Sequence, residues 1–382
     1  MTVYFDNAAT TPLAPEVLDV MLPMLRDDFG NPSSTHQFGR KTKSAIEMAR
    51  KTIAKLLHCS PMEICFTSGG TEADNMAIHG AIEELGVTRI ISSLAEHHAV
   101  LHTVEHCQAN CNVELEMVRL TDQGHVDVEH LKELLASSDE KTLVSLMHAN
   151  NEIGTMIDIH QIARLCEEHG ALFHSDTVQT MGHYPMDLSK TKVHFVTGAA
   201  HKFHGPKGVG FLYINKDVHV NSLIRGGSQE RNMRAGTENI YGIVGMAKAL
   251  ELALEHVDEH QKHIQSIKDY MCKKLKEEIP GTNFNGCPDK SLYTVLNARL
   301  PKTDKAEMLL FLLDIDGIAC SGGSACSSGS NQGSHVLRAI NADTTVPSIR
   351  FSFSRYSTKD EVDYVVEKLA KHIEVVIPEV TS

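Results

Sequence analysis

The sequence predicts an α/β protein: a mostly parallel sheet with helices on both faces, plus a small α+β domain. Between short apolar runs lie stretches with helical spacing of apolar residues, such as 127–136 and 158–169. Continuous apolar strands that alternate with helices are typical of a parallel sheet buried on both faces. The apolar runs that we expect to form strands are 63–68, 89–92, 142–147, 171–175 and 193–196.

The second half of the chain carries a different pattern. Residues 240–278 read as one long helix that ends before Pro280-Gly281, and strand-like pieces follow at 291–299 and 348–354. Thr358 and Glu361 fit a capping box at the start of a last helix. A chain of 382 residues is longer than one hydrophobic core usually supports. We therefore expect two domains, a large one over 13–255 and a small one over 1–12 and 256–382.

Composition excludes several classes of function. The formal net charge of −13 argues against nucleic-acid binding, because counterion release requires a basic patch. The sequence shows neither a signal peptide nor an apolar run of about 20 residues, so we expect no membrane segment. Nine cysteines, an odd number without an export signal, indicate reduced thiols and a cytoplasmic location.

Three segments follow apolar runs, where ligands bind in open α/β sheets. Thr67 to Asn75 is rich in small residues at a helix start and could bind a phosphate, although a plain tight turn fits as well. Asp176 could hold a pyridinium nitrogen or cap a helix. Lys202 could form a Schiff base, with Lys207 as its rival. Together, these are the three parts that pyridoxal 5'-phosphate requires of a protein.

Motifs along nearly the whole chain resemble those of the cysteine desulfurases, which are pyridoxal-phosphate enzymes. The resemblance implies a transferase fold of the aspartate-aminotransferase kind (fold type I) and release of sulfur from L-cysteine, leaving L-alanine. The segments that carry it are 6–12, 31–36, 67–72, 96–100, 150–154, 176–179, 201–208, 234–239 and 323–327.

The resemblance also assigns roles to the residues that bind the cofactor. Lys202 matches the lysine that forms the Schiff base, Asp176 the partner of the pyridine nitrogen, and Gln179 the donor to the ring hydroxyl. His97 corresponds to the histidine that stacks on the ring and carries protons. The phosphate ligands implied are Gly70, Thr71 and His201, with Thr237 reaching across from the second subunit of a homodimer.

The resemblance also assigns the residues that bind the substrate and those that take its sulfur. Asn151 and Arg350 correspond to the groups that hold the substrate carboxylate. Strand alternation alone puts Phe351 and Phe353 on one face and Arg350 on the other, whereas either Arg350 or Arg355 could equally be a surface charge.

Cys326 lies in a stretch of Gly and Ser, which predicts a mobile, exposed segment, unlike the surroundings of Cys320. The resemblance to the long-loop class implies that Cys326 takes the sulfur as a persulfide. It then passes the sulfur to a protein acceptor, either an iron–sulfur scaffold or a tRNA-thiolation protein.

One residue departs from the family pattern, because Ala199 stands where a serine hydroxyl usually meets the phosphate. Thr197 is a candidate to supply this hydroxyl instead. If it does not, we expect a lower affinity for the cofactor. Three rival functions stay open: a selenocysteine lyase, an aminotransferase, and a non-enzymatic sulfur-relay protein. The histidines and cysteines at 98, 102, 106, 107 and 111 have spacings that could gather a metal, but we expect no metal site.

Overall fold

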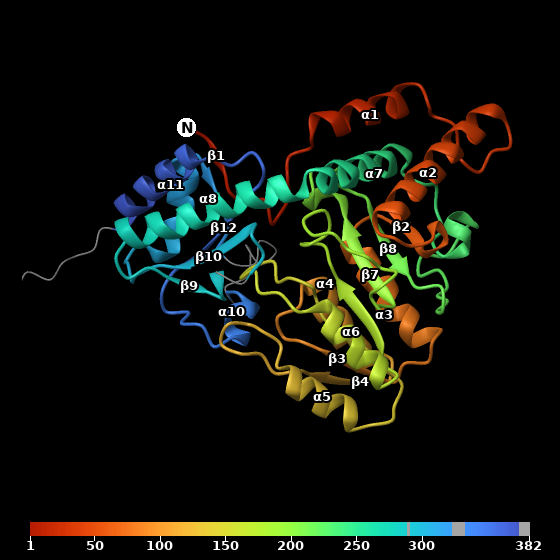
Figure 1. The fold of residues 1–382 in the computed structure, drawn as a ribbon, viewed down its shortest axis with the longest axis horizontal. Coiled ribbons are helices and arrows are strands. Elements are labelled where there is room, and N and C mark those ends of the chain that lie inside the picture. The colour runs from red at the N-terminus through yellow and green to blue at the C-terminus, as the bar shows by residue number, and fades with distance from the viewer. Residues whose placement is uncertain (289–290, 323–332, 374–382) are drawn as a thin grey trace, which may run out of the picture.

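A seven-stranded sheet forms the centre of the large part of the molecule (Figure 1), in a computed structural model that describes residues 1–288, 291–322 and 333–373. The strand order is β2-β8-β7-β6-β5-β3-β4, and all neighbours are parallel except β8, which is antiparallel to β2 and β7. The predicted mostly parallel sheet is therefore confirmed. Its strands are β2 (Ile64–Thr67), β3 (Arg89–Ser92), β4 (Glu114–Met117), β5 (Thr142–Ser145), β6 (Leu172–Asp176), β7 (Phe195–Ala199) and β8 (Gly210–Ile214).

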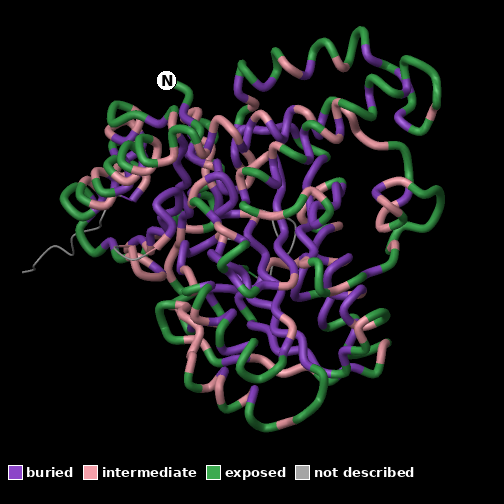
Figure 2. The backbone as a smooth tube through the Cα atoms, turned by 45° about the vertical axis from the view of Figure 1, so that its right-hand side comes forward, coloured by how far each residue is buried: buried purple, intermediate pink, exposed green. Residues whose placement is uncertain are grey.

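Helices pack on both faces of this sheet because its strands are apolar on both sides. On β2, Cys65 belongs to the apolar cluster beneath α3 and α4, whereas Phe66 belongs to the cluster beneath α2, α6 and α7. Figure 2 shows buried segments running through the middle of the molecule with exposed segments around them. The helices are α1 (Pro15–Arg26), α2 (Gln37–Leu56), α3 (Gly70–Glu83), α4 (His98–Asn110), α5 (Val128–Ala136), α6 (Ile159–Glu168) and α7 (Ile240–Glu255).

The single long helix predicted over 240–278 is wrong. The chain forms two helices, α7 and then α8 (Val257–Glu278), because the backbone of His256 leaves helical geometry at φ −114° and ψ 21°. Helix α7 packs on α1 and α2, whereas α8 packs on α11 of the smaller part. The break therefore falls where the chain passes from one core to the other, which periodicity of apolar residues does not reveal.

The smaller part has its own core. A three-stranded antiparallel sheet, β12-β10-β9, packs with α8 and α11, and the N-terminal Val3 and Phe5 join the same apolar cluster. The predicted capping box of Thr358 and Glu361 is confirmed at the start of α11. We propose the division into residues 13–255 and residues 1–12 with 256–382 as the domain organisation. The elements are β1 (Val3–Tyr4), β9 (Asn283–Asn285), β10 (Val295–Arg299), β11 (Ile318–Ala319), β12 (Ser348–Ser352), α9 (Leu309–Ile315), α10 (His335–Ala339) and α11 (Lys359–His372).

Candidate active site

A cavity of about 270 Å³ opens at the carboxyl ends of β6 and β7, next to the smaller part. Parallel strands end at the same edge of a sheet, so residues distant in sequence meet there. All but two of the predicted site residues line it: Gly70, Thr71, His97, Asn151, Asp176, Gln179, His201, Lys202 and Arg350.

Asp176 is the last residue of β6 and is almost fully buried. Its Oδ1 accepts a hydrogen bond from the backbone N–H of Val178 at 2.8 Å, within a turn, so the alternative of a helix cap is wrong. Burial, followed by the neighbouring carboxyl of Asp74, raises the pKa of Asp176 to about 7. A cationic ring nitrogen in the cavity would restore its ionised form.

Lys202 ends the short 3-10 helix η2 (Ala200–Lys202), directly after β7. Its Nζ donates to the backbone oxygens of Ala8 at 2.6 Å and Ala9 at 2.8 Å, so the N-terminal segment places the amine in the cavity. The rival Lys207 is exposed and does not line this cavity. The geometry therefore favours Lys202 over Lys207 as the lysine that would form the Schiff base.

His97 and Gln179 complete the groups around the lysine. His97 caps α4, and its Nδ1 accepts from the backbone N–H of Ala99 at 3.1 Å. Burial and then the charge of Lys202 lower the pKa of His97 to about 4, so the ring is neutral near pH 7 with its proton on Nε2. Gln179 is buried and donates from Nε2 to the backbone oxygen of Ala8 at 3.1 Å.

The first turn of α3 offers an anion site. Gly70 and Thr71 begin this helix, whose free N–H groups and positive dipole end attract a phosphate. A Cβ at Gly70 would lie 2.9 Å from Cγ2 of Val178, so a larger residue would not fit without movement. The Nδ1 of His201 lies 3.2 Å from Oγ1 of Thr10 at the same end of the cavity.

Ala199 lines the cavity beside this turn and brings no hydroxyl to it. The candidate replacement, Thr197, does not supply one either, because its Oγ1 lies 3.3 Å from Nε2 of the buried His174. The hydroxyl of Thr197 is therefore used beneath the cavity rather than at the phosphate end.

Arg350 enters the cavity from β12 of the smaller part. Its Nη2 donates to Oδ1 of Asp6 at 2.8 Å and its Nη1 to the backbone oxygen of Asn151 at 3.0 Å. Its buried Nε has no hydrogen-bond partner within the described residues. Phe351 and Phe353 lie in the core on the opposite face, so the predicted strand alternation is confirmed. Each Nη of Arg350 carries a second hydrogen, so the guanidinium keeps donors for a carboxylate in the cavity.

Among the described residues, one predicted site residue is not found in the cavity. Thr237 lies in a separate depression with Ser68 and Arg234. Cys326 lies outside the described residues.

Sequence reasoning assigned no role to four further residues that line the cavity: Asp74, Glu152, His335 and the backbone of Ala8. Asp74 stood within the predicted phosphate segment, but nothing in its spacing showed that it would face inward. Among the described residues, no group of three or more His, Cys, Asp or Glu is placed to hold a metal ion. No described helix is long and apolar enough to cross a membrane.

The residues present fit pyridoxal phosphate. A buried carboxylate faces the cavity at one strand end, an amine stands at the next, and a helix start provides the anion site between them. Lys202 would hold the cofactor's aldehyde carbon, Asp176 its ring nitrogen, and Gly70 with Thr71 its phosphate. This combination defines a pyridoxal-phosphate enzyme with the transferase fold.

Comparison with known proteins agrees with this class. The family model of aminotransferase class-V matches residues 3–365. A relative from Dictyoglomus turgidum, named cysteine desulfurase IscS, is 44% identical over 376 residues, which cover 97% of this chain and 94% of the relative. The chain belongs to the aminotransferase class-V family and, within it, to the cysteine desulfurases.

Solved structures give the same result. A structure titled NifS-like protein superposes with a TM-score of 0.90 at 37% identity, covering 97% of this chain and 99% of that one. Another, titled SspA in complex with cysteine, has a TM-score of 0.81 at 31% identity and covers 94% of this chain and 100% of its own. The predicted pyridoxal-phosphate transferase fold is confirmed.

Proposed function

We propose that this enzyme removes sulfur from L-cysteine, leaves L-alanine, and holds the sulfur as a persulfide on Cys326. The observation that carries the proposal is the meeting of Lys202 and Asp176 with Arg350 in one cavity, which suits an amino acid bound to pyridoxal phosphate. When bound, this cofactor withdraws electrons from the substrate's Cα and weakens the bonds around it.

Arg350 orients the substrate through its carboxylate. The guanidinium is fixed by Asp6 and by the backbone oxygen of Asn151, and the second hydrogen on each Nη remains for the substrate. A planar guanidinium held in this way selects a carboxylate by geometry as well as charge. The side chain of Asn151 lines the same end of the cavity and is proposed as a second carboxylate contact.

Lys202 and His97 are proposed to move the protons. The amine of Lys202 is proposed to take the proton from the substrate's Cα, and the neutral Nε2–H form of His97 to donate a hydrogen bond to the reacting groups. The imidazole of His97 would carry a proton by taking one at its unprotonated nitrogen and giving one back as imidazolium.

Cys326 is proposed as the sulfur acceptor. Its thiolate forms a bond to the substrate sulfur, the Cβ–S bond breaks, and its electron pair passes to the carbon side, which becomes alanine after protonation. The neighbouring Cys320 is a poor candidate for this step, because burial, followed by the charge of Asp6, raises its pKa to about 12.

The test is alanine release and protein-bound persulfide after addition of L-cysteine. Cys326→Ala should lose the persulfide and nearly all alanine release, whereas the matched control Cys320→Ala should keep both. Unchanged alanine release in Cys326→Ala would contradict the role of Cys326. Alanine release from selenocysteine but not from cysteine would favour a selenocysteine lyase.

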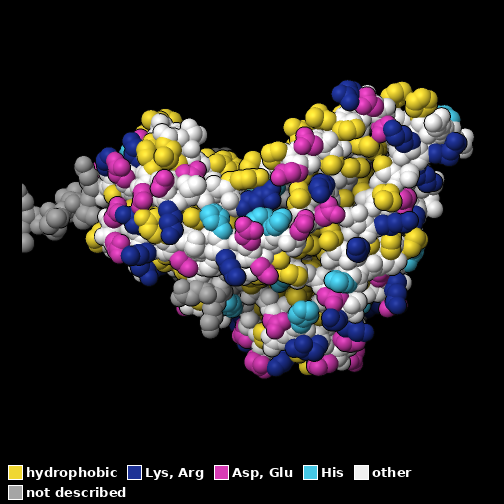
Figure 3. Space-filling model, turned by 45° about the horizontal axis from the view of Figure 1, so that its top comes forward, with side chains coloured by type: hydrophobic (Ala, Val, Ile, Leu, Met, Phe, Trp, Pro, Cys, Tyr) yellow, Lys and Arg dark blue, Asp and Glu magenta, His cyan; other side chains and the backbone are white. Residues whose placement is uncertain are grey.

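A homodimer is proposed as the working form. Exposed apolar side chains gather over α1, the loop after it and the start of α2, as Figure 3 shows along the upper edge. Thr237 lies outside the cavity of its own chain, which supports a role at the partner's phosphate. The exposed apolar residues are Leu18, Leu22, Leu25, Phe29 and Phe38.

Mixed dimers test this arrangement. When Lys202→Ala and Thr237→Ala chains are combined, a dimer of one each has one intact site if Thr237 acts across the interface. Activity at limiting cofactor should then exceed that of either variant alone. If Thr237 acts within its own chain, mixing should restore nothing.

The acceptor of the sulfur is proposed to be a protein, either an iron–sulfur scaffold or a tRNA-thiolation protein, and the location the cytoplasm. The cysteines at 59, 65, 107, 111, 166, 287 and 320 are free thiols, which supports a reducing compartment. Incubating the persulfide form with purified candidate acceptors and measuring sulfur transfer would distinguish the two.

A further inference from the structure

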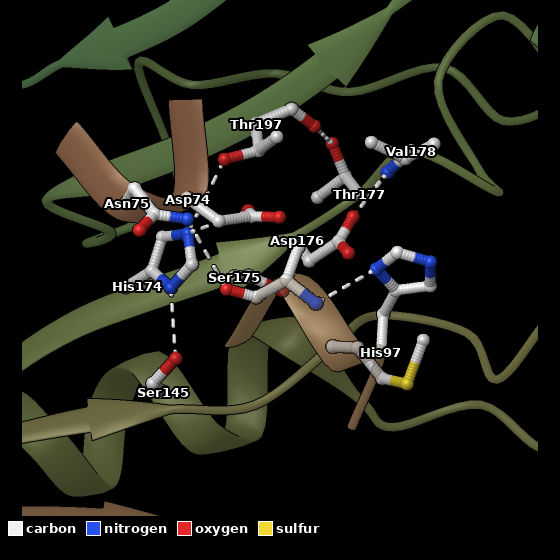
Figure 4. Close-up of polar contacts among 12 residues, drawn as sticks. Asp74, Asn75, His97, Ser145, His174, Ser175, Asp176, Thr177, Val178 and Thr197 are labelled. Carbon is white, nitrogen blue, oxygen red and sulfur yellow. Dashed lines mark hydrogen bonds and ion pairs between the residues drawn. The ribbon is translucent and has the colours of Figure 1, made fainter. Parts of the chain in front are cut away.

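A buried polar group lies beneath the cavity and has no role in the proposed reaction. It consists of Asp74 on α3 and His174 on β6, with hydroxyls from β5 and β7 around the imidazole. Asp74 and His174 are at most 1% exposed. Figure 4 shows the ring of His174 between Asp74, Ser145 and Thr197, with Asp176 further along the same strand.

The polar atoms of this group lie close together. His174 Nε2 lies 3.4 Å from Oδ1 of Asp74 and 3.3 Å from Oγ1 of Thr197, and its Nδ1 lies 2.8 Å from Oγ of Ser145. Oδ1 of Asp74 has no hydrogen bond to any described residue. A carboxyl and an imidazole buried together at this distance need at least one proton between them, since an unpaired buried charge is costly.

Asp74 and His174 lie on the same side of the sheet as Asp176, which is the residue at the floor of the cavity. His174 and Asp176 are two positions apart on β6, so their side chains leave the strand on the same face. Asp74 also lines the cavity that Asp176 faces. Other titratable groups packed around Asp176 are Lys202 and, from the segment before α4, Glu96 and His97.

We propose that Asp74 and His174 share one buried proton and act as positioning residues that set the charge of Asp176. While the pair keeps its proton, it is neutral overall, and Asp176 can ionise against the ring nitrogen of the cofactor. If the pair lost its proton, a second negative charge would stand beside Asp176 and oppose its ionisation. The inference rests on the proposed role of Asp176 but on no step involving Cys326.

The electrostatics of the three groups agree with this arrangement. Burial raises the pKa of Asp74 to about 7 and lowers the pKa of His174 to about 4, so near neutral pH the proton stays on the carboxyl side. After burial itself, the charge of Asp74 is the largest influence that raises the pKa of Asp176. His174 is neutral near pH 7 and acts through Asp74, because without this imidazole as acceptor Asp74 would lose its proton more readily. Removing Asp74 and removing His174 should therefore shift the pKa of Asp176 in opposite directions.

Shifts of the Asp176 pKa in opposite directions would distinguish the proposal from a purely structural role, which would not produce them. The pKa of the Asp176 carboxyl is measured in the cofactor-free protein by difference infrared spectroscopy, with Asp176→Asn as the reference. Asp74→Asn should lower this pKa by roughly one pH unit, and His174→Asn should raise it by a similar amount. The matched control is His194→Asn, because the Nδ1 of His194 accepts from the backbone N–H of Phe173 at 3.0 Å, away from Asp176.

The dissociation constant of pyridoxal phosphate as a function of pH gives a second readout. In Asp74→Asn, tight binding should extend to lower pH than in the wild type, because Asp176 ionises earlier. An unchanged pKa in both variants, or shifts in the same direction, would overturn the inference. If Asp74→Asn does not fold, His174→Asn decides alone: an unchanged or lowered pKa of Asp176 would reject the proposal. Neither readout depends on desulfurase activity.

Discussion

The cavity has two walls of different origin. The sheet wall, formed by Asp176, Gln179 and Lys202, comes from consecutive strand ends of the large parallel sheet. The second wall is formed by Arg350, whose guanidinium is held by Asp6, 344 residues away in the sequence. The difference separates two tasks: the sheet wall holds the groups for chemistry, and the Arg350 wall holds the groups for binding the substrate.

The largest effect should follow a change in the sheet wall. Lys202→Ala removes both the attachment of the cofactor and a proton carrier, so kcat for alanine release should fall about 10²- to 10⁴-fold. The exposed Lys207 provides the control, and Lys207→Ala should stay within a few-fold of the wild type. Equal losses of kcat in Lys202→Ala and Lys207→Ala would contradict the inference that the position of Lys202 in the sheet wall makes it the lysine of the reaction.

A change in the Arg350 wall should act on binding instead. Arg350→Lys keeps the charge but loses the planar fork, so KM for L-cysteine should rise roughly 10- to 100-fold, with a smaller change in kcat. Arg355, whose Nη2 donates to the hydroxyl of Tyr356 at 2.9 Å, is the matched control. A fall in kcat with an unchanged KM would break the proposed division between the two walls.

The smallest effect concerns the phosphate end of the sheet wall. Ala199→Ser should restore the missing hydroxyl beside the first turn of α3 and tighten binding of pyridoxal phosphate about 10-fold. The dissociation constant can be followed by cofactor absorbance. Weaker binding in this variant would show that the buried site, where Ala199 is 1% exposed, has no room for the added oxygen.

The same two walls explain how far the sequence could predict the site. Parallel strands place their carboxyl ends at one edge, so apolar runs followed by Asp176 and Lys202 were enough to bring these residues together. The contact between Asp6 and Arg350 was not predicted, because no periodicity relates residues at opposite ends of a chain.

Other details depend on tertiary packing alone. The break at His256 occurs where two cores meet, and the contact between Asp74 and His174 depends on how α3 packs on the sheet. Thr197 shows the same limit. Its place two residues before Ala199 suggested a phosphate contact, but its hydroxyl lies near the imidazole of His174 beneath the cavity.

The most direct test of the account is to find the residue that carries the cofactor. The purified holoenzyme is reduced with borohydride and digested, and the modified peptide is identified by mass spectrometry. The account predicts a single pyridoxyl group on Lys202, in the peptide that follows β7. Modification of Lys207, or of no lysine, would contradict the proposed site at the edge of the large sheet.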